Sequence, residues 1–517
     1  MSEVIFQRLL VMAERHGLLL ILMVALLRLS FVLSSDLDLI GDESYYWDWS
    51  RQPDWCYYSK PPMVAWLIHL STSLLGHVTW AVRLPTLFLG TLGLVLFQAT
   101  ARAFYGSSAA ALALLMLLAT PVNVLANFLM TIDPPLYCFW IMSVYFMQRA
   151  LFEHRVLDWW WAGCASALAL LSKQAALVLP LSLLLFLVLD AQYRDCLKKQ
   201  FLWYLTPIVL AALPILFWNQ QHDWVMFGHS QSHFSTHQSP GLSKHLQQAG
   251  EFMAYQALLI SPLLLALVII ESVRGLLGFR ALESRQRFLW LMGPLAVLST
   301  LLLSLLQKAQ GNWSMPFYFT ALLFLVGQWQ RGRWRRTLRH ALLIGYVMVG
   351  LTYALPLVIR ALDLQNSALD PTRRFKHWQA FAVDVQQHRL QALPPMQGGF
   401  VVALGHRYLA SQLAFYLPDH PKVFRYEASG RVTSQYEVWP GPFEFVGQNA
   451  LIVSSGNAQS VPIALRSAFE VFETLGPVAN PDKPQSPYTL YLGRHLKQWP
   501  SPFNPKISGT VNAASEN

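Results

Sequence analysis

The fold is decided around residues 41–62, GDESYYWDWSRQPDWCYYSKPP, which follow directly on the first long apolar run of the chain. Two adjacent carboxylates, Asp42 and Glu43, open this stretch, a series of Tyr and Trp rings follows, and Lys60 stands before a pair of prolines. Rings of this kind gather where a membrane meets water. Because a loop at that boundary needs no carboxylates to fold, we expect the stretch to carry chemistry and the rest of the chain to support it.

The composition indicates a polytopic membrane protein. The 517 residues are 54% hydrophobic and 13% charged, with a mean hydropathy of +0.36, whereas soluble domains carry about 25% charged residues. The four cysteines show no metal-binding spacing and imply no disulfide framework. The net charge of +10 does not indicate nucleic acid, because the basic residues are spread over the loops between apolar runs rather than gathered in one patch.

Eleven apolar runs approach the length of about 20 residues that a helix needs to cross a bilayer. They predict an all-α membrane domain over 1–360, and the shorter apolar segment at 63–76 is expected to be re-entrant or interfacial. The predicted spans are 17–34, 82–104, 107–126, 134–149, 159–172, 174–190, 201–218, 249–270, 288–306, 316–329 and 341–359.

The basic residues beside these spans predict the orientation of the chain. They are frequent in the segments that share a side with the N-terminus, such as 274–287 and 331–339, and sparse on the other side. Since cytoplasmic loops carry the excess of Lys and Arg, the N-terminus is expected to be cytoplasmic. The external face then holds the loops 35–81 and 219–248 and everything after residue 360, so every candidate for chemistry falls on one face.

A second acidic candidate is Asp133, which lies in the motif TIDPP at the external start of a predicted span. Prolines are well tolerated in the first turn of a helix, so Asp133 is expected near the N-cap, where helix capping alone would explain it. Four cations also lie at external span ends. Such side chains either extend to the interface with no further role or bind an anion, most simply a phosphate; they are Lys60, Arg83, Lys173 and Lys308.

Two more external segments add candidate substrate-binding residues. The segment 219–248 holds five histidines, including the candidate His222, and three of them recur every four residues. A zinc site would need three or four ligands in fixed geometry, but Ser, Pro and Gly interrupt any continuous helix, so a flexible polar loop without metal is favoured. The segment LLQKAQGNWSMPFY contains a tight turn, and its candidates are Asn312, Trp313 and Tyr318.

The character of the chain changes after residue 360, where the charge rises. Short apolar runs of strand type lie at 399–404, 422–426, 449–454 and 488–492, and helical patterns lie at 374–390 and 407–417. Helices that alternate with strands predict a small external α/β domain over 361–500. The remaining residues, 501–517, have the composition of a disordered tail.

Several motifs, taken in order, resemble the family 39 and 83 glycosyltransferases of the GT-C class. The resemblance covers roughly residues 20–330 through GDESYYWDWS, YYSKPPMVAWL, AVRLPT, TIDPP, LSKQAAL and GNWSMPFY, and RYLASQLAFYL and QYEVWPGP extend it to the C-terminal domain. These families include protein O-mannosyltransferases and bacterial aminoarabinose transferases that act on lipid A. The resemblance implies a hexosyl- or pentosyltransferase of the bacterial inner membrane. It would move a sugar from a polyprenyl phosphate, such as undecaprenyl phosphate, to lipid A, lipopolysaccharide or another envelope glycan at the periplasmic face.

The resemblance also implies roles for individual residues. The acid of the family's first loop maps to Asp42, its second acidic position to Asp133, and the lysine of its KPP motif to Lys60. Asp42 is then the general base, Glu43 and Asp133 orient acceptor and sugar, and Lys60 with the other cations binds the phosphate. A single displacement would invert the anomeric carbon. Ser59 departs from the Glu or Asp-His of bacterial members, so no cofactor is expected to be required, although a divalent metal stays open.

Three other functions are considered. A protein O-glycosyltransferase of the same class would use the same donor chemistry. A lipid transporter or flippase would place ionisable residues near mid-membrane and show repeated halves, but Arg28 is the main charge inside a predicted span and no halves repeat. A non-catalytic scaffold would leave the clustered acids and lysines without a purpose.

Overall fold

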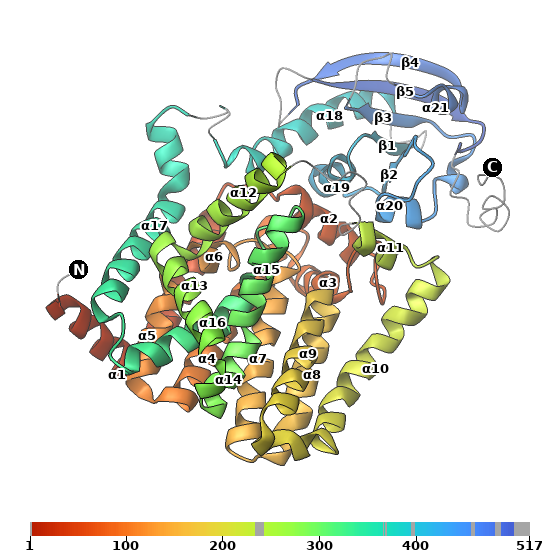
Figure 1. The fold of residues 1–517 in the computed structure, drawn as a ribbon. Coiled ribbons are helices and arrows are strands. Elements are labelled where there is room, and N and C mark those ends of the chain that lie inside the picture. Colours follow the sequence, from red (N-terminus) through yellow and green to blue (C-terminus); the bar gives the residue numbers. More distant parts are fainter. Residues whose placement is uncertain are drawn as a thin grey trace.

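The computed structural model describes residues 3–232, 242–364, 367, 370–393, 399–455, 461–480 and 487–500. A bundle of helices forms most of the molecule, and a five-stranded sheet with its own helices lies at one end of it (Figure 1). This architecture confirms the predicted fold class, a helical membrane domain with a C-terminal α/β domain. The predicted tail and two of the loop histidines, His233 and His237, lie outside the described residues.

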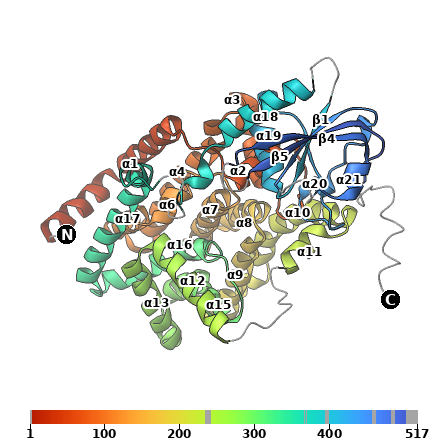
Figure 2. The ribbon, with the colours of Figure 1, turned by 90° about the horizontal axis from the view of Figure 1, so that it is seen from above.

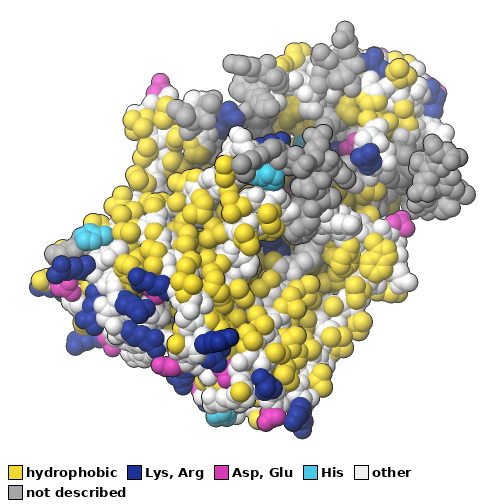
Figure 3. All heavy atoms as spheres, viewed as in Figure 1, with side chains coloured by type: hydrophobic (Ala, Val, Ile, Leu, Met, Phe, Trp, Pro, Cys, Tyr) yellow, Lys and Arg dark blue, Asp and Glu magenta, His cyan; other side chains and the backbone are white. Residues whose placement is uncertain are grey.

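The apolar runs of the sequence form the helices of the bundle, since a chain in hydrocarbon must satisfy its backbone polar groups internally. Among the described residues, five helices are long and apolar enough to cross a membrane, or six if the bent pair α12–α13 is one span. Figure 3 shows an apolar band on the bundle, with Lys and Arg gathered at the end away from the sheet. The helices are α1 (Glu3–Ser34), α4 (Thr79–Tyr105), α5 (Ser107–Leu118), α6 (Pro121–Leu125), α7 (Asp133–Phe152), α8 (Val156–Ser172), α9 (Val178–Leu189), α10 (Gln200–Gln221), α12 (Leu242–Ile260), α13 (Pro262–Leu277), α14 (Ser284–Met292), α15 (Pro294–Leu306), α16 (Met315–Gln330) and α17 (Arg335–Ala361).

The prediction of one continuous span at 249–270 is wrong. The segment is broken into α12 and α13, which are bent by 110° around Ser261, where φ is +81°. Pro262 has no backbone N–H and disfavours the helical conformation of the residue before it. The chain therefore turns at this point. The predicted span 107–126 is divided in the same way, between α5 and α6, with Pro121 at the start of α6.

The aromatic stretch that follows α1 folds into helix α2 (Gly41–Ser50), and α3 (Met63–Leu75) comes next. The prediction that its rings form a belt at the membrane surface is wrong for most of them. Trp47 and Trp49 are fully buried, whereas Trp55 is exposed. The buried rings share one apolar core with side chains of the C-terminal domain. The stretch is therefore the contact between the two domains.

The C-terminal domain is built on a sheet with the strand order β2-β1-β3-β5-β4. β1 pairs in parallel with β2 and β3, and β5 pairs antiparallel with β3 and β4. The edge strand β4 has no counterpart in the predicted strands, because half of its side chains are exposed and it lacks an apolar run. The elements are β1 (Phe400–Leu404), β2 (Val423–Arg425), β3 (Ala450–Ser454), β4 (Phe469–Val478), β5 (Tyr488–Leu496), α18 (Trp378–Ala392), α19 (Arg407–Tyr416), α20 (Gln435–Val438) and α21 (Ile463–Ser467).

The C-terminal domain docks on the loop between α1 and α4 through helix α19, which packs on α2. The hydroxyls of Ser44 and Ser411 lie 2.9 Å apart, and the hydroxyl of Tyr436 donates to Asp48 at 2.6 Å. Figure 2 shows the sheet on the side of the bundle where α10 and α11 (Val225–Ser232) lie, with α1 and α17 on the opposite side. Residues far apart in the chain thus surround the acids of the first loop.

Candidate active site

The adjacent acids Asp42 and Glu43 lie in different environments, and Glu43 is the buried one. Its Oε1 and Oε2 accept hydrogen bonds from Arg83 Nε at 2.9 Å and Nη2 at 2.8 Å. Arg83 also donates to the backbone carbonyls of Leu37 and Asp38, and Glu43 accepts from the backbone N–H of Met130. Neither side chain is more than 1% exposed. In this arrangement the pair fixes the loop and does not present a charge to a substrate.

The second acid, Asp133, brings three of the predicted residues together. Its Oδ1 accepts from Lys173 Nζ at 2.8 Å and its Oδ2 accepts from Asn312 Nδ2 at 2.8 Å. Asp133 starts α7, Lys173 follows α8, and Asn312 lies in the turn before α16. The carboxylate is therefore used by other elements rather than by the N–H groups of its own helix. The ion pair is 15% and 10% exposed, so it is partly open.

The turn that carries Asn312 is fixed by Gln256 of α12. Gln256 Oε1 accepts from Ser314 Oγ at 2.6 Å and from the Tyr318 hydroxyl at 3.0 Å, and its Nε2 donates to the Gly311 carbonyl at 2.9 Å. The predicted candidate Tyr318 thus supports the turn, and Trp313 lies half-buried in it. Gln256 itself is fully buried.

Asp42, at the start of α2, has one bonded and one free oxygen. Its Oδ1 accepts from the hydroxyl of Tyr408 in α19 at 2.8 Å, and in the described part of the chain no group bonds to Oδ2. The ring of Tyr408 lies where a side chain at Gly41 would be. Burial, followed by the charge of Asp42, raises the pKa of Tyr408 to about 12. Tyr408 is therefore protonated near neutral pH and donates a hydrogen bond to Asp42.

Lys60 lies within electrostatic reach of both acids. Burial, followed by the charge of Lys173, lowers the pKa of Lys60 to about 8, and the charges of Asp133 and Asp42 oppose this shift. Its ammonium forms no hydrogen bond or ion pair with any residue that the structure describes. A partly buried lysine without a partner can bind one, and an anion is the partner that its charge favours.

Two further predicted residues, Lys308 and His222, lie outside the group formed by Asp42, Asp133 and Lys60. Lys308 is exposed on the turn after α15. His222 stacks on Trp218 with ring centroids 4.0 Å apart, and its Nδ1 lies 2.8 Å from the Trp218 carbonyl oxygen. Within the described ranges, no contact joins His222 to Asp42, Asp133 or Lys60, and no group of three or more His, Cys, Asp or Glu could hold a metal ion.

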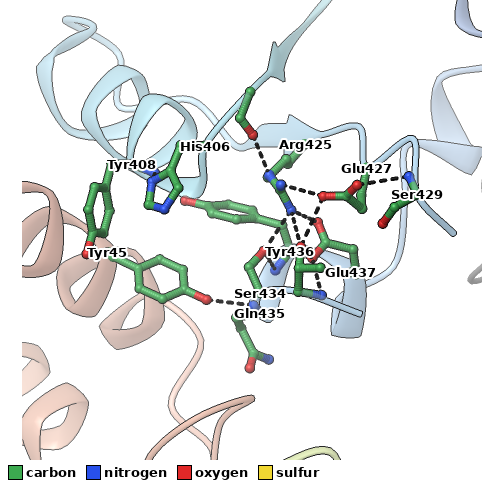
Figure 4. A network of polar contacts seen from close by, with 12 residues as sticks. Tyr45, His406, Tyr408, Arg425, Glu427, Ser429, Ser434, Gln435, Tyr436 and Glu437 are labelled. Atoms are coloured by element: carbon green, nitrogen blue, oxygen red, sulfur yellow. Dashed lines mark hydrogen bonds and ion pairs between the residues drawn. The ribbon is translucent and has the colours of Figure 1, made fainter. Parts of the chain in front are cut away.

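The sequence analysis missed the residues that the C-terminal domain contributes. Arg407 lies over the rings of Tyr45 and Tyr408, with its guanidinium carbon 5.2 Å and 5.1 Å from their centroids. Its Nη2 is 3.4 Å from the Tyr408 hydroxyl. Figure 4 shows Tyr45 of α2 facing this part of the domain beside His406 and Tyr408. The available signal was the sequence RYL at the start of a predicted helix, directly after a buried strand.

A narrow, mostly apolar pocket lies between helices of the bundle, and Pro134, the residue after Asp133, lines it. Its cavity volume is about 40 Å³. Pro134 and Tyr137 of α7, Tyr318 of α16 and Ile260 of α12 are among its lining residues. Most of the lining residues are apolar. Apolar surface therefore lies next to the helix start that carries Asp133.

Comparisons with known proteins agree with the resemblance to glycosyltransferases that the sequence motifs indicated. A family model described as dolichyl-phosphate-mannose-protein mannosyltransferase matches residues 59–218. The lipid A galacturonosyltransferase RgtD of Rhizobium johnstonii is 30% identical over 338 residues, which are 62% of this chain and 68% of the relative.

Solved structures share the fold. The crystal structure of ArnT from Cupriavidus metallidurans in the apo state has a TM-score of 0.61 at 17% identity, covering 93% of this chain and 98% of that one. The structure of ArnT bound to undecaprenyl phosphate has a TM-score of 0.63, covering 92% and 98%. With RgtD related at this identity and coverage, the chain belongs to the GT-C glycosyltransferases and is a multi-pass membrane glycosyltransferase.

Proposed function

We propose that this enzyme transfers a sugar from a polyprenyl-phosphate donor to a lipid acceptor, lipid A or lipopolysaccharide, at the periplasmic face of the bacterial inner membrane. The observation that carries the proposal is the contact of Asp133 with both Lys173 and Asn312, which come from three separate elements, with the charges of Asp42 and Asp133 acting on Lys60. The undecaprenyl phosphate bound to ArnT supports a donor of this class.

In the proposed reaction Asp42 acts on the acceptor. Its free Oδ2 would accept the proton of an acceptor hydroxyl, a contribution of about 10²- to 10⁴-fold. The acceptor oxygen then attacks the anomeric carbon as the bond to the donor phosphate breaks, which inverts that carbon. If the acceptor atom is a phosphate oxygen, with a second pKa of about 6, Asp42 positions it instead. Tyr408 orients the carboxylate through Oδ1.

The leaving polyprenyl phosphate gains negative charge as the bond breaks, and fixed cations stabilise it. Lys173 is paired with Asp133, and the charges of both acids act on Lys60. Asp133 holds Lys173 in place, and Asn312 donates to Asp133; both present oxygen and nitrogen atoms that would bind sugar hydroxyls. Since the lysines supply the positive charge, we expect EDTA to leave the transfer rate unchanged.

The acceptor is assigned from the relative RgtD, whose name specifies lipid A. A second candidate, a protein acceptor, is favoured by the family model that matches residues 59–218. The purified enzyme in nanodiscs would be given polyprenyl-phosphate sugars with either lipid A or an unfolded envelope protein. Sugar found by mass spectrometry on protein alone would overturn the lipid assignment.

The test of the chemistry is Asp42→Asn in the full-length protein. We expect normal expression and loss of transfer by at least about 10²-fold, while Asp384→Asn, an exposed acid on α18, keeps full activity. Normal turnover of Asp42→Asn would remove Asp42 from the mechanism. Movement of donor lipid across vesicles by the wild-type protein, without sugar transfer, would instead support a flippase.

A further inference from the structure

The cations around the site differ in whether a carboxylate neutralises them. Arg83 is paired with Glu43 and Lys173 with Asp133. In the C-terminal domain, Arg425 is bound at 2.6 Å by both Glu427 and Glu437, as Figure 4 shows. These cations have their charge balanced inside the protein, and they need no ligand.

Lys60 and Arg407 are different. Neither forms an ion pair with any residue in the described part of the chain, although both are partly buried. The Nε of Arg407 is a buried donor that has no hydrogen-bond partner among the described residues. A buried charged donor that is left without a partner destabilises the folded protein. Proteins accept such a cost mainly where a ligand completes the bonding.

Both cations are linked to the carboxylate of Asp42. Arg407 reaches the Tyr408 hydroxyl at 3.4 Å, and that hydroxyl donates to Asp42 at 2.8 Å. The charge of Arg407 acts on Lys60, as does the charge of Asp42. The rings of Tyr45 and Tyr408 lie against the guanidinium, and its Nη2 donates to the Tyr408 hydroxyl. Arg407 is thus oriented by these two side chains, while its Nε has no partner among the described residues.

We propose that Arg407, from the C-terminal domain, and Lys60, from the first loop, form an anion-binding subsite beside Asp42 that takes a negatively charged group of the donor. The group is either the donor phosphate or a carboxylate on the transferred sugar, and a planar guanidinium binds both in the same two-pronged way. The inference rests on the proposed function and adds a substrate-binding residue, Arg407, from outside the membrane domain. It also makes the C-terminal domain part of the substrate site.

Binding of undecaprenyl phosphate alone to the full-length protein in nanodiscs tests whether the subsite binds the donor phosphate. We expect Arg407→Gln to weaken this binding by about 10- to 100-fold and Arg407→Lys by less, because lysine keeps the charge but not the fork. The matched control is Arg466→Gln, an exposed arginine on α21 of the same domain, which should bind like the wild type. The thermal midpoint of each variant would show whether its fold is intact.

Transfer kinetics test the sugar source. Polyprenyl-phosphate donors that carry a hexuronic acid and the corresponding neutral hexose would be compared. If Arg407 binds the carboxylate, Arg407→Gln raises KM about 10-fold or more for the uronic acid donor only. Tyr408→Phe provides a contrast, since it should lower kcat through Asp42 and leave the affinity for undecaprenyl phosphate unchanged.

The outcomes separate the two proposals. If the wild type binds undecaprenyl phosphate but transfers no sugar, the proposed function fails, and the response of that binding to Arg407→Gln still decides the subsite. If Arg407→Gln alters neither the binding of undecaprenyl phosphate nor KM for either donor, the subsite is overturned. A loss of kcat and thermal stability with unchanged affinity would make Arg407 a structural residue only. Absence of binding by the wild type would overturn both proposals.

Discussion

Two ion pairs of this enzyme have the same separation but different surroundings. The charged atoms of Glu43–Arg83 and of Asp133–Lys173 are both 2.8 Å apart. The first pair is closed to solvent and bonded to loop backbone on both sides. The second is 15% and 10% exposed, and its remaining carboxylate oxygen is bonded to Asn312. The difference teaches that backbone partners and residual exposure separate a pair that shapes the protein from a pair that can meet a substrate.

The largest effect is expected from Arg83→Met, which would leave Glu43 buried and unpaired. Removal of one partner of a buried ion pair costs about 3–5 kcal/mol. We expect this variant to be poorly expressed and to have a strongly lowered thermal midpoint, measured by tryptophan fluorescence in nanodiscs. A stable Arg83→Met protein that has only lost affinity for the donor would contradict the structural role of this pair.

Lys173→Met should have the opposite profile, with activity reduced far more than stability. We expect kcat/KM to fall about 100-fold, which corresponds to about 2.7 kcal/mol of transition-state stabilisation. The partial exposure of the pair limits the effect on folding. Lys198→Met, in an exposed pair with Asp195, is the control for loss of a lysine. Equal loss of thermal stability in Lys173→Met and Arg83→Met would remove the distinction between the pairs.

The pH dependence of Lys60 sharpens the comparison, because this cation lies beside the open pair. Its pKa of about 8 is below the ordinary 10.5, so kcat/KM should fall as the pH rises through about 8, by about 10-fold near pH 9. Between the two pKa values the unfolded chain binds more protons, so this group favours folding increasingly as the pH rises. Activity and stability should thus change in opposite directions. Lys60→Arg should shift the activity loss to higher pH, and an unchanged profile would refute the assignment.

The smallest effect is expected from Asn312→Ala. The substitution removes one hydrogen bond to Asp133, worth about 1.5–3 kcal/mol with a charged partner, but water can replace it at this partly open position. We expect kcat/KM to fall about fivefold with no change in the thermal midpoint. A loss as large as that of Lys173→Met would mean that Asn312 contacts the substrate directly.

Much of the helical architecture and part of the site could be predicted from the sequence. The apolar runs marked the helices because hydrocarbon forces the backbone to bond within each helix. The prolines of TIDPP placed Asp133 at a helix start. The predicted membrane topology put Lys173 and Asn312 on the same face of the membrane as Asp133. These predictions depend on local patterns, which a sequence displays directly.

The remaining features depend on contacts between distant segments. The rings of α2 have the composition of a membrane belt, but a domain that begins more than 300 residues later covers them. The same packing supplies Tyr408 and Arg407 to Asp42. Gln256 gives no local signal, because one amide in an apolar helix becomes informative only when the turn that it bonds is known.

The Tyr408 hydroxyl reaches back across 366 positions of the chain to Asp42. A ribosome that has made the whole helical bundle has therefore not yet made the group that orients this carboxylate. In the proposed mechanism, transfer must therefore wait until the last portion of the polypeptide has been synthesised and folded onto the first loop. The order of synthesis would then keep an incomplete chain from cleaving lipid-linked sugars before an acceptor can be held.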